Sequence, residues 1–278
     1  MIQDIGEHIF DNQYHPSLPD RESYALYYED HAALVRKYPD RIEFPRFRDI
    51  ERLNEDVYED AVYLFSIDGE RYYLVEEINR ERQSHYTMEN TEIFRYAEPQ
   101  YLAFAGITGY QLHNWYQSRR FCGKCGRRMK KDSKERMLYC ESCHNMEFPK
   151  ICPAVIIGVT DGDKILMSKY AGRTYKKYAL LAGFTEIGET LEETVQREVM
   201  EEVGLKVKNI RYYKSQPWSF TDTLLMGFYC DLDGEAAITL DREELAMAEW
   251  FQRDEIPVEP ERDSITNEMI IRFKSGEV

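Results

Sequence analysis

The sequence predicts an α/β (α+β) protein in three parts: an N-terminal α+β domain over residues 1–118, a cysteine-rich module over 119–150 and a C-terminal α/β domain over 151–278. Three observations lead to this division. Strand and helix signals alternate after residue 150, two CxxC pairs lie just before it, and the first part combines a hairpin signal with a helical pattern. A chain of 278 residues is long enough for two domains and a small module.

Composition and charge exclude several classes of protein. With 43% hydrophobic and 13% aromatic residues, the chain can build real cores, so long disordered stretches are not expected. Its 36 lysines and arginines against 51 aspartates and glutamates give a net charge of −15, which opposes broad, non-specific binding to nucleic acid. The opening MIQDIGEHIF lacks the basic start and apolar run of a signal peptide, and no stretch approaches a membrane span. We therefore expect a soluble, cytoplasmic protein.

The N-terminal part, residues 1–118, predicts a supporting or dimerisation domain. The stretches AVYLFSI and RYYLVEE are joined through Asp68-Gly69, a dipeptide that favours the tight turn of a β-hairpin. A helical pattern follows from about Tyr101 to Gln117. No group of residues in this part matches a catalytic signature.

The cysteine-rich module has the spacing C-x2-C-x14-C-x2-C, formed by Cys122, Cys125, Cys140 and Cys143. Each pair can place two thiolates on one tight turn, and two such turns complete a tetrahedron around zinc. Four thiolates leave no open coordination position, so the predicted zinc is structural. Cys152 and Cys230 lie outside the pattern among apolar residues and are expected in the core.

The C-terminal part predicts an α/β domain with two helices. Strands are expected, from their β-branched and aromatic content, at PAVIIGVT, KILMSKY, ALLAG, KVKNIRYY, TLLMGFYCDL and AAITL. The first two are joined by a turn at Asp161-Gly162-Asp163. Besides the helix discussed next, a C-terminal helix is expected over about 264–273, because apolar residues recur there every four positions.

An acidic helix follows the third of these strands. Thr190 and Glu193 form a capping box, so the helix should begin at Leu191, and Gly204 is placed to end it. An apolar row anchors one side of the helix: Leu191, Val195, Val199 and Val203. Glu198, Glu201 and Glu202 crowd together on another side, where they repel one another unless a hard cation such as Mg²⁺ or Mn²⁺ lies among them. The alternative is an ordinary solvated acidic helix.

The spacing from Gly183 to Leu205 fits the pattern G-x5-E-x7-R-E-U-x-E-E-x-G-U at every position. This stretch resembles the signature of the Nudix hydrolases, which cleave a nucleoside diphosphate linked to another moiety by means of divalent metals. The resemblance implies an α/β/α sandwich with a mixed sheet. It also implies that the metal ligands are the carboxylates of Glu198, Glu201 and Glu202 and the backbone carbonyl of Ala182. Arg197 is expected to orient these carboxylates, with Glu189 as its partner.

A second stretch, SQPWSFTDTLL at 215–225, resembles SQPWPFPxS, the mark of the NADH pyrophosphatase branch of this family. That branch includes enzymes that remove NAD caps from RNA 5′ ends, and a four-cysteine zinc ribbon directly before the Nudix domain is its usual arrangement. The resemblance implies that substrate is bound by residues 215–222: Ser215, Gln216, Pro217, Trp218, Ser219, Phe220, Thr221 and Asp222. Ser219 and Thr221 replace two prolines, which should loosen a loop here.

The same resemblance implies further site residues. Glu135 matches a position that contacts substrate, Phe184 is a candidate to stack on a base or the nicotinamide, and Glu244 matches a late metal ligand. Phe148 stands where relatives often have tyrosine, and Thr266 replaces a small residue near the ligand. Each also has an ordinary alternative: Phe184 and Trp218 as core aromatics, Glu135 as a solvated side chain, and Glu244 as a favourable charge at an expected helix start. Relatives form homodimers whose pocket draws on both chains, so a homodimer is expected.

The function predicted from the resemblance is hydrolysis of NAD(H) to NMN(H) and AMP, with removal of NAD caps from RNA 5′ ends as a further expectation. The net charge then limits RNA contacts to the cap and a few nucleotides. One alternative is a broader pyrophosphohydrolase of ADP-ribose or dinucleoside polyphosphates. Another is a zinc-ribbon regulator that binds nucleotide without cleaving it, although a pure binder need not keep the full set Glu198, Glu201 and Glu202.

Overall fold

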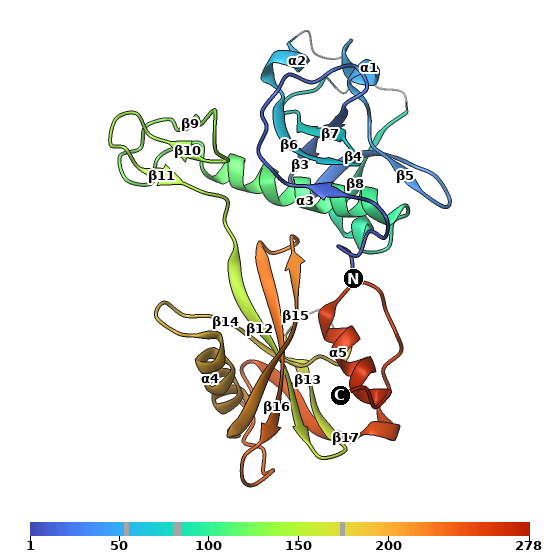
Figure 1. The fold of residues 1–278 in the computed structure, drawn as a ribbon, viewed down its shortest axis with the longest axis vertical. Coiled ribbons are helices and arrows are strands. Elements are labelled where there is room, and N and C mark those ends of the chain that lie inside the picture. Colours follow the sequence, from blue (N-terminus) through green and yellow to red (C-terminus); the bar gives the residue numbers. More distant parts are fainter. Residues whose placement is uncertain (53–55, 80–84, 173–175) are drawn as a thin grey trace. The chain divides into compact units, whose positions relative to one another are not determined.

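The structure, a computed structural model, describes residues 1–52, 56–79, 85–172 and 176–278. The chain forms two compact units, shown as ribbons in Figure 1. One contains residues 2–150 with 219–221, and the other contains 151–218 and 222–278 with Met1. In the described ranges, no helix combines the length and apolarity that crossing a membrane requires.

In the described ranges, the N-terminal unit has two small sheets before the cysteine-rich module. The first has the order β1-β6-β7-β2, with bounds Phe10–Asp11, Val62–Ile67, Glu70–Leu74 and Tyr24–Leu26. Strands β6 and β7 are antiparallel and meet at Asp68 and Gly69, whose φ angles of 54° and 80° are those of a tight hairpin turn. The predicted hairpin is therefore confirmed. The second sheet pairs β4 with three strands; the bounds are β3 Tyr28–Glu29, β4 Ala32–Lys37, β5 Ile42–Glu43 and β8 Thr87–Asn90.

Helix α3, Gln100–Ser118, carries much of the core of this unit and confirms the helix predicted at 101–117. Its buried side chains pack with those of the sheets around Phe65, Tyr72 and Phe94. Gly106 lets the helix approach closely, since a Cβ there would lie 2.5 Å from the ring of Phe94. Three short helical segments complete the domain: α1 Phe47–Ile50, α2 Val57–Asp60 and η2 Thr91–Arg95.

The cysteine-rich module folds as a three-stranded antiparallel sheet in the order β11-β10-β9. The strands are short, at Met146–Glu147, Leu138–Tyr139 and Lys130–Lys131. Met129 and Leu138 are buried in the core of the N-terminal unit, so the module is attached to that unit by apolar contacts.

The C-terminal unit is built on a six-stranded mixed sheet in the order β15-β16-β12-β13-β17, with β14 paired to β12. The strand bounds are β12 Cys152–Asp161, β13 Lys164–Tyr170, β14 Leu181–Phe184, β15 Val207–Trp218, β16 Thr223–Leu232 and β17 Leu245–Gln252. β12 and β16 are parallel, and the other pairs are antiparallel. Five of the six predicted strands of this part are present.

Two helices cover the opposite faces of this sheet (Figure 1). Val155 and Ile157 of β12 pack with Val195 and Val199 of α4, Leu191–Val203. Ile156, between them in the chain, points to the other face and packs with Ile265 and Met269 of α5, Ile265–Lys274. The unit is the expected α/β/α sandwich with a mixed sheet, and both predicted helices are confirmed.

Three expectations in this unit are wrong. AAITL at 236–240 is not a strand; the sixth main strand is β17, a short distance later in the chain. Glu244 therefore lies in the turn before a strand and not at a helix start. Residues 215–218 are not part of a loop, because they form the end of β15, paired with β16 as far as Trp218. A short helical segment, η3 at Arg253–Glu255, follows β17.

Candidate active site and zinc centre

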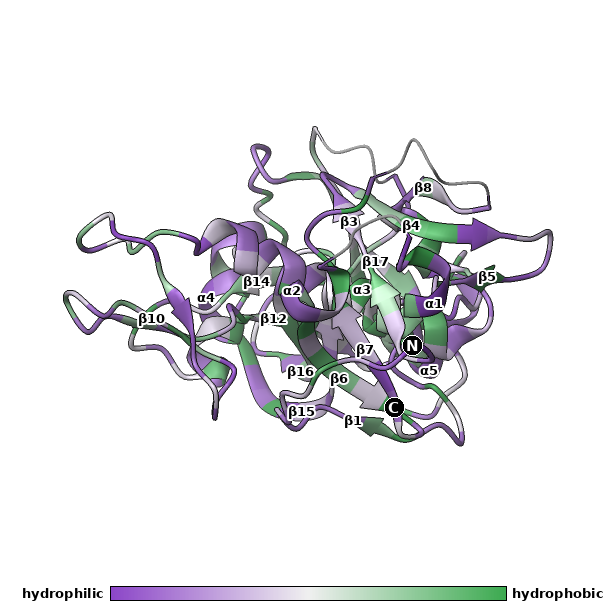
Figure 2. Cartoon of the chain, turned by 90° about the horizontal axis from the view of Figure 1, so that it is seen from above, coloured by the Kyte–Doolittle hydropathy of each residue, from purple (hydrophilic) through white to green (hydrophobic). Residues whose placement is uncertain are grey.

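Helix α4 is fixed at both ends by its own residues. The hydroxyl of Thr190 accepts a hydrogen bond from the N–H of Glu193 at 3.2 Å, and the Glu193 carboxylate accepts one from the N–H of Thr190 at 2.8 Å. Gly204 ends the helix at φ 69°, a conformation that costs glycine little. The predicted capping box and terminator are thus confirmed. Figure 2 shows α4 coloured largely hydrophilic, in keeping with an acidic helix anchored along one apolar row.

Arg197 is the centre of the polar network on this helix. Its Nε and Nη2 donate to the two carboxylate oxygens of Glu189, at 2.6 and 2.9 Å. Its Nη1 donates to Glu198 at 2.7 Å and to Glu201 at 2.9 Å, and its Nη2 also donates to the backbone carbonyl of Phe184 at 3.0 Å. One guanidinium therefore links the helix to the loop before it and to the end of β14.

Glu189 is the paired carboxylate of this network. The Arg197 guanidinium, the N–H of Glu186 and the hydroxyl of Thr194 together lower the pKa of Glu189 to about 2. The carboxylate is therefore charged near neutral pH, which favours its pairing with Arg197. Thr194 is a contact that the sequence analysis did not predict: it is fully buried and its hydroxyl donates to Glu189 at 3.0 Å. No sequence motif identifies Thr194, because its contact depends on how the loop that carries Glu189 folds against the helix.

Glu198 lies directly against the backbone of β14. A Cβ at Gly183 would fall 1.9 to 2.3 Å from the carboxyl atoms of Glu198, so only glycine leaves room for this side chain. Gly183 follows Ala182, whose carbonyl is one of the predicted metal ligands. Burial raises the pKa of Glu198; the Arg197 guanidinium opposes this effect, and the charges of Glu201 and Glu244 add to it.

The other predicted metal ligands surround this point. Glu202 is buried, while Glu201 and Glu244 are exposed, and Glu244 is near enough to Glu198 to affect its pKa. Within the described residues, no three of these acids bring their carboxylate oxygens within 4.8 Å of one another. Arg197 lies among them instead. The available donors, carboxylate oxygens and one carbonyl, fit a hard divalent cation such as Mg²⁺ or Mn²⁺.

The SQPW residues belong to the edge strand β15. Pro217 is tolerated there because an edge strand has one side without ladder partners. Gln216 is fully buried, and its amide spans the start of α5: the nitrogen donates to the carbonyl of Asp263 at 2.8 Å, and the oxygen accepts from the N–H of Ile265 at 2.7 Å. Thr266, the next residue of α5, is partly exposed. Gln216 therefore fixes the backbone at the start of α5, next to Thr266. Ser215 and Trp218 are partly exposed.

The remaining predicted substrate residues are spread over both units. Phe184 is 56% exposed at the end of β14, so it is not a core aromatic. Ser219, Phe220 and Thr221 form a turn that groups with the N-terminal unit, where Arg95 stacks over the ring of Phe220 at 4.5 Å. Asp222, at φ 57°, ends the turn, and its carbonyl accepts from the N–H of Cys152.

Two predicted substrate residues lie in the cysteine-rich module. Glu135 is exposed in the turn between β9 and β10, where its N–H donates to the Asp132 carboxylate at 2.9 Å. Phe148 is 54% exposed just after β11. Both are accessible to a ligand.

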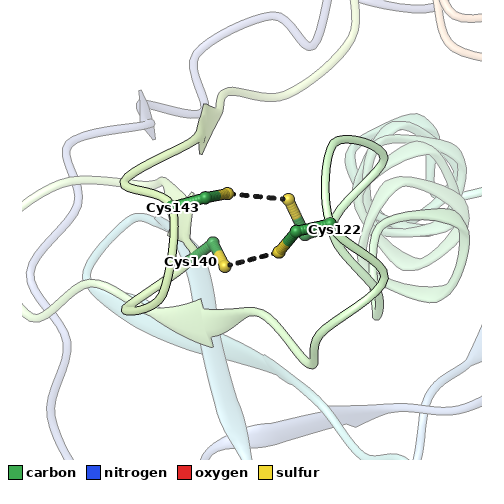
Figure 3. A group of neighbouring side chains, drawn as sticks. Cys122, Cys140 and Cys143 are labelled. Atoms are coloured by element: carbon green, nitrogen blue, oxygen red, sulfur yellow. Dashed lines mark hydrogen bonds between the residues drawn. The ribbon is translucent and has the colours of Figure 1, made fainter.

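The four predicted cysteines converge, as Figure 3 shows for the three labelled ones. Sulfur–sulfur distances are 3.5 Å between Cys122 and Cys143 and 3.4 Å between Cys125 and Cys140, and all four sulfurs lie within 4.8 Å of one another. Four thiolates at about 2.3 Å from one zinc ion would be roughly 3.8 Å apart. The cluster therefore supports a structural zinc ion. Cys230 is buried in the core as expected, whereas Cys152 is only half-buried, so its predicted place in the core is wrong.

The two cysteine turns are built in the same way. In the first turn, the N–H of Gly126 donates to the carbonyl of Cys122, and the N–H of Cys122 donates to the carbonyl of Arg127. In the second turn, the N–H of His144 donates to the carbonyl of Cys140, and the N–H of Cys140 donates to the carbonyl of Asn145. The φ angles of Gly126 and His144 are 73° and 57°, so both turns use a left-handed residue at the same position.

Comparisons with known proteins agree with this geometry. The NAD-capped RNA hydrolase NudC of Photorhabdus laumondii subsp. laumondii is 41% identical over 162 residues, which are 58% of this chain and 63% of the relative. The protein of the same name from Enterobacter sp. (strain 638) is also 41% identical, over 58% of this chain and 62% of its own length. The chain thus aligns with somewhat under two thirds of these relatives.

Family models match two adjoining segments. The NUDIX domain model matches residues 150–273, which include α4, β15 and α5. The NADH pyrophosphatase zinc ribbon domain model matches residues 117–148, which include the four cysteines. The chain therefore carries a NUDIX domain directly preceded by an NADH pyrophosphatase zinc ribbon domain.

Proposed function

We propose that this protein is a metal-dependent pyrophosphohydrolase that splits NAD(H) into NMN(H) and AMP and removes NAD caps from RNA 5′ ends. The observation that carries the proposal is the Arg197-centred acid cluster of α4, in a NUDIX domain next to an NADH pyrophosphatase zinc ribbon domain. Relatives about 40% identical over this region are named NAD-capped RNA hydrolases. Water attacks one phosphorus, the P–O–P bridge breaks, and each product keeps one phosphate.

We assign the metal to Glu198, Glu201, Glu202 and Glu244 with the carbonyl of Ala182. Bound Mg²⁺ or Mn²⁺ would neutralise the diphosphate oxygens and lower the pKa of the attacking water. Arg197, held by Glu189, keeps the helix carboxylates in position and must yield part of its contact with them when a cation binds. Glu201 is the ligand best placed to move, because its side chain is 59% exposed.

The nucleotide is assigned to the predicted substrate residues of both units, most of which are at least partly exposed. Phe184 and Trp218 offer ring faces for a base or the nicotinamide, and Ser215, Pro217, the turn 219–222, Thr266, Glu135 and Phe148 are further proposed contacts. Gln216 acts differently in this proposal: because it is buried and braces the start of α5, it positions Thr266 and does not touch substrate.

Three coarser features complete the proposal. The homodimer rests on the resemblance described above, and the division at residues 118 and 150 rests on the sequence patterns described there. A reducing compartment such as the cytoplasm suits six unbridged cysteines, four of them arranged for zinc.

The first prediction concerns the substrate. With Mn²⁺, NADH should yield NMNH and AMP, and NAD-capped RNA should yield NMN and 5′-monophosphate RNA, as measured by product analysis. ADP-ribose and dinucleoside polyphosphates should be turned over more slowly than NADH. Much faster turnover of ADP-ribose would replace this proposal with the broader hydrolase.

The second prediction tests the metal assignment. Glu202→Gln removes a charge from the cluster without changing its shape, so kcat for NADH should fall about 100-fold or more. Glu192→Gln is the matched control, since Glu192 is exposed in the first turn of the same helix and contacts none of these residues. Equal activity of both variants would exclude Glu202 as a metal ligand.

The third prediction tests the contact between Glu198 and β14. Gly183→Ala places a methyl group where the carboxyl group lies, so it should lower the free energy of unfolding by about 1–3 kcal/mol and kcat about 100-fold. In the double variant Gly183→Ala/Glu198→Ala the clash is gone. Stability measured by denaturant unfolding should then recover while activity stays lost. A single variant with normal activity would show that Glu198 functions from another position.

The fourth prediction concerns zinc. The purified chain should hold about one zinc ion, and Cys140→Ser should lower the zinc content and the melting temperature together, because binding of a structural metal contributes to folding. Cys152→Ser, outside the cluster, should keep its zinc. Full zinc content in the Cys140→Ser variant, measured by elemental analysis, would contradict the site.

A further inference from the structure

The zinc ribbon begins with a strongly basic segment in an otherwise acidic chain. Residues 119–134, RRFCGKCGRRMKKDSK, contain eight lysines and arginines and one aspartate. The whole chain has 36 lysines and arginines against 51 aspartates and glutamates. The net charge of −15 therefore conceals a local excess of positive charge at this place. A concentration of one sign in a single module is the electrostatic footprint of an anionic partner.

Most of these cations are exposed, and half of them make a polar side-chain contact within the fold, among them Arg120, which donates to Gln117 at 3.4 Å. Arg119, Lys130 and Lys131 form ion pairs, with Glu147, Glu141 and Glu76 respectively. The other five are Arg120, Lys124, Arg127, Arg128 and Lys134. All five are exposed, and none forms an ion pair with another residue of the described ranges. They are available to neutralise phosphates.

An exposed aromatic ring lies among these charges. Phe121 is 64% exposed, although a phenylalanine beside a packed core could easily be buried. It faces Arg128 across an antiparallel bridge, so the two side chains lie on the same side of the first cysteine turn. The turn is fixed on its other side by the buried Cys122 and Met129. Phe121 therefore stands on a rigid base, next to a guanidinium.

We infer that this surface, defined by Arg120, Phe121, Lys124, Arg127 and Arg128 and called here the basic knuckle, binds the single-stranded RNA that follows the NAD cap. The inference rests on the proposed function and extends it from the cap to the transcript. Arginine and lysine would contact the phosphates, and a base would stack on Phe121, the combination that proteins use to hold single strands without reading their sequence.

The alternatives fit the chemistry less well. A free dinucleotide has two phosphates, too few to engage five cations. An anionic membrane would match the charges, but it would not need an exposed aromatic ring beside them. Five cations neutralise only a few phosphates, which agrees with the short RNA contact that the net charge predicts.

The fifth prediction tests the basic knuckle on the full chain. The double variant Arg127→Gln/Arg128→Gln should lower kcat/KM for an NAD-capped RNA of about 20 nucleotides roughly tenfold at 0.1 M salt and leave kcat/KM for NADH unchanged. The slope of log(kcat/KM) against log salt should become shallower by about 1.4, or about 0.7 for each charge removed. Phe121→Ala should lower kcat/KM for the capped RNA about fivefold without changing the salt slope.

The matched control is Lys206→Gln/Lys208→Gln, which removes the same charge from exposed positions of the NUDIX domain. It should leave both substrates unaffected, and zinc content and melting temperature verify that every variant is folded. Equal losses on RNA and NADH, or no loss on RNA, would overturn the inference while leaving the proposed function intact.

Binding of uncapped RNA of the same sequence, measured by fluorescence anisotropy, separates the inference from the activity. If the wild type hydrolyses neither substrate, the proposed function fails, and weaker RNA binding by the double variant would still support the surface. Binding to vesicles of anionic lipid that the double variant loses, with RNA binding unchanged, would assign the surface to membranes instead.

Discussion

Carboxylates crowded on one helix repel one another unless a positive charge lies among them, and here that charge is the guanidinium of Arg197. It contacts Glu189, Glu198, Glu201 and the carbonyl of Phe184, so a single side chain ties together helix α4, the loop before it and strand β14. Glu189 stays ionised because three donors converge on it. Arg197 thus holds in place the carboxylates proposed to bind a divalent cation, which would limit the reorganisation that binding requires.

The parts of this structure that could be predicted are those specified by nearby residues. The capping box at Thr190, the left-handed Gly204 and the hairpin at Asp68-Gly69 each depend on a few neighbours, and each was predicted. The cysteine cluster was predicted because its spacing allows few other arrangements. The resemblance supplied the α/β/α sandwich, since the pairing of β12 with β16 joins residues about 70 positions apart and leaves no local signal.

The expectations that failed all depend on distant partners. AAITL has the composition of a strand, but the edge of the sheet beside β13 is taken by β17. The burial of Gln216 could not be predicted either, because its amide bonds the start of a helix that begins some fifty residues later. The close approach of Glu198 to Gly183 is of the same kind: the motif contains both residues, while the reason for the glycine is visible only in three dimensions.

Pro217 has a consequence for how the molecule can associate. It lies near the end of β15, the outermost strand of its sheet, and has no N–H to offer. At this position the strand cannot donate a hydrogen bond to an incoming extended segment, which makes pairing of another strand with this end of β15 less favourable. That is also where Trp218 is displayed, and its ring stays clear of backbone pairing.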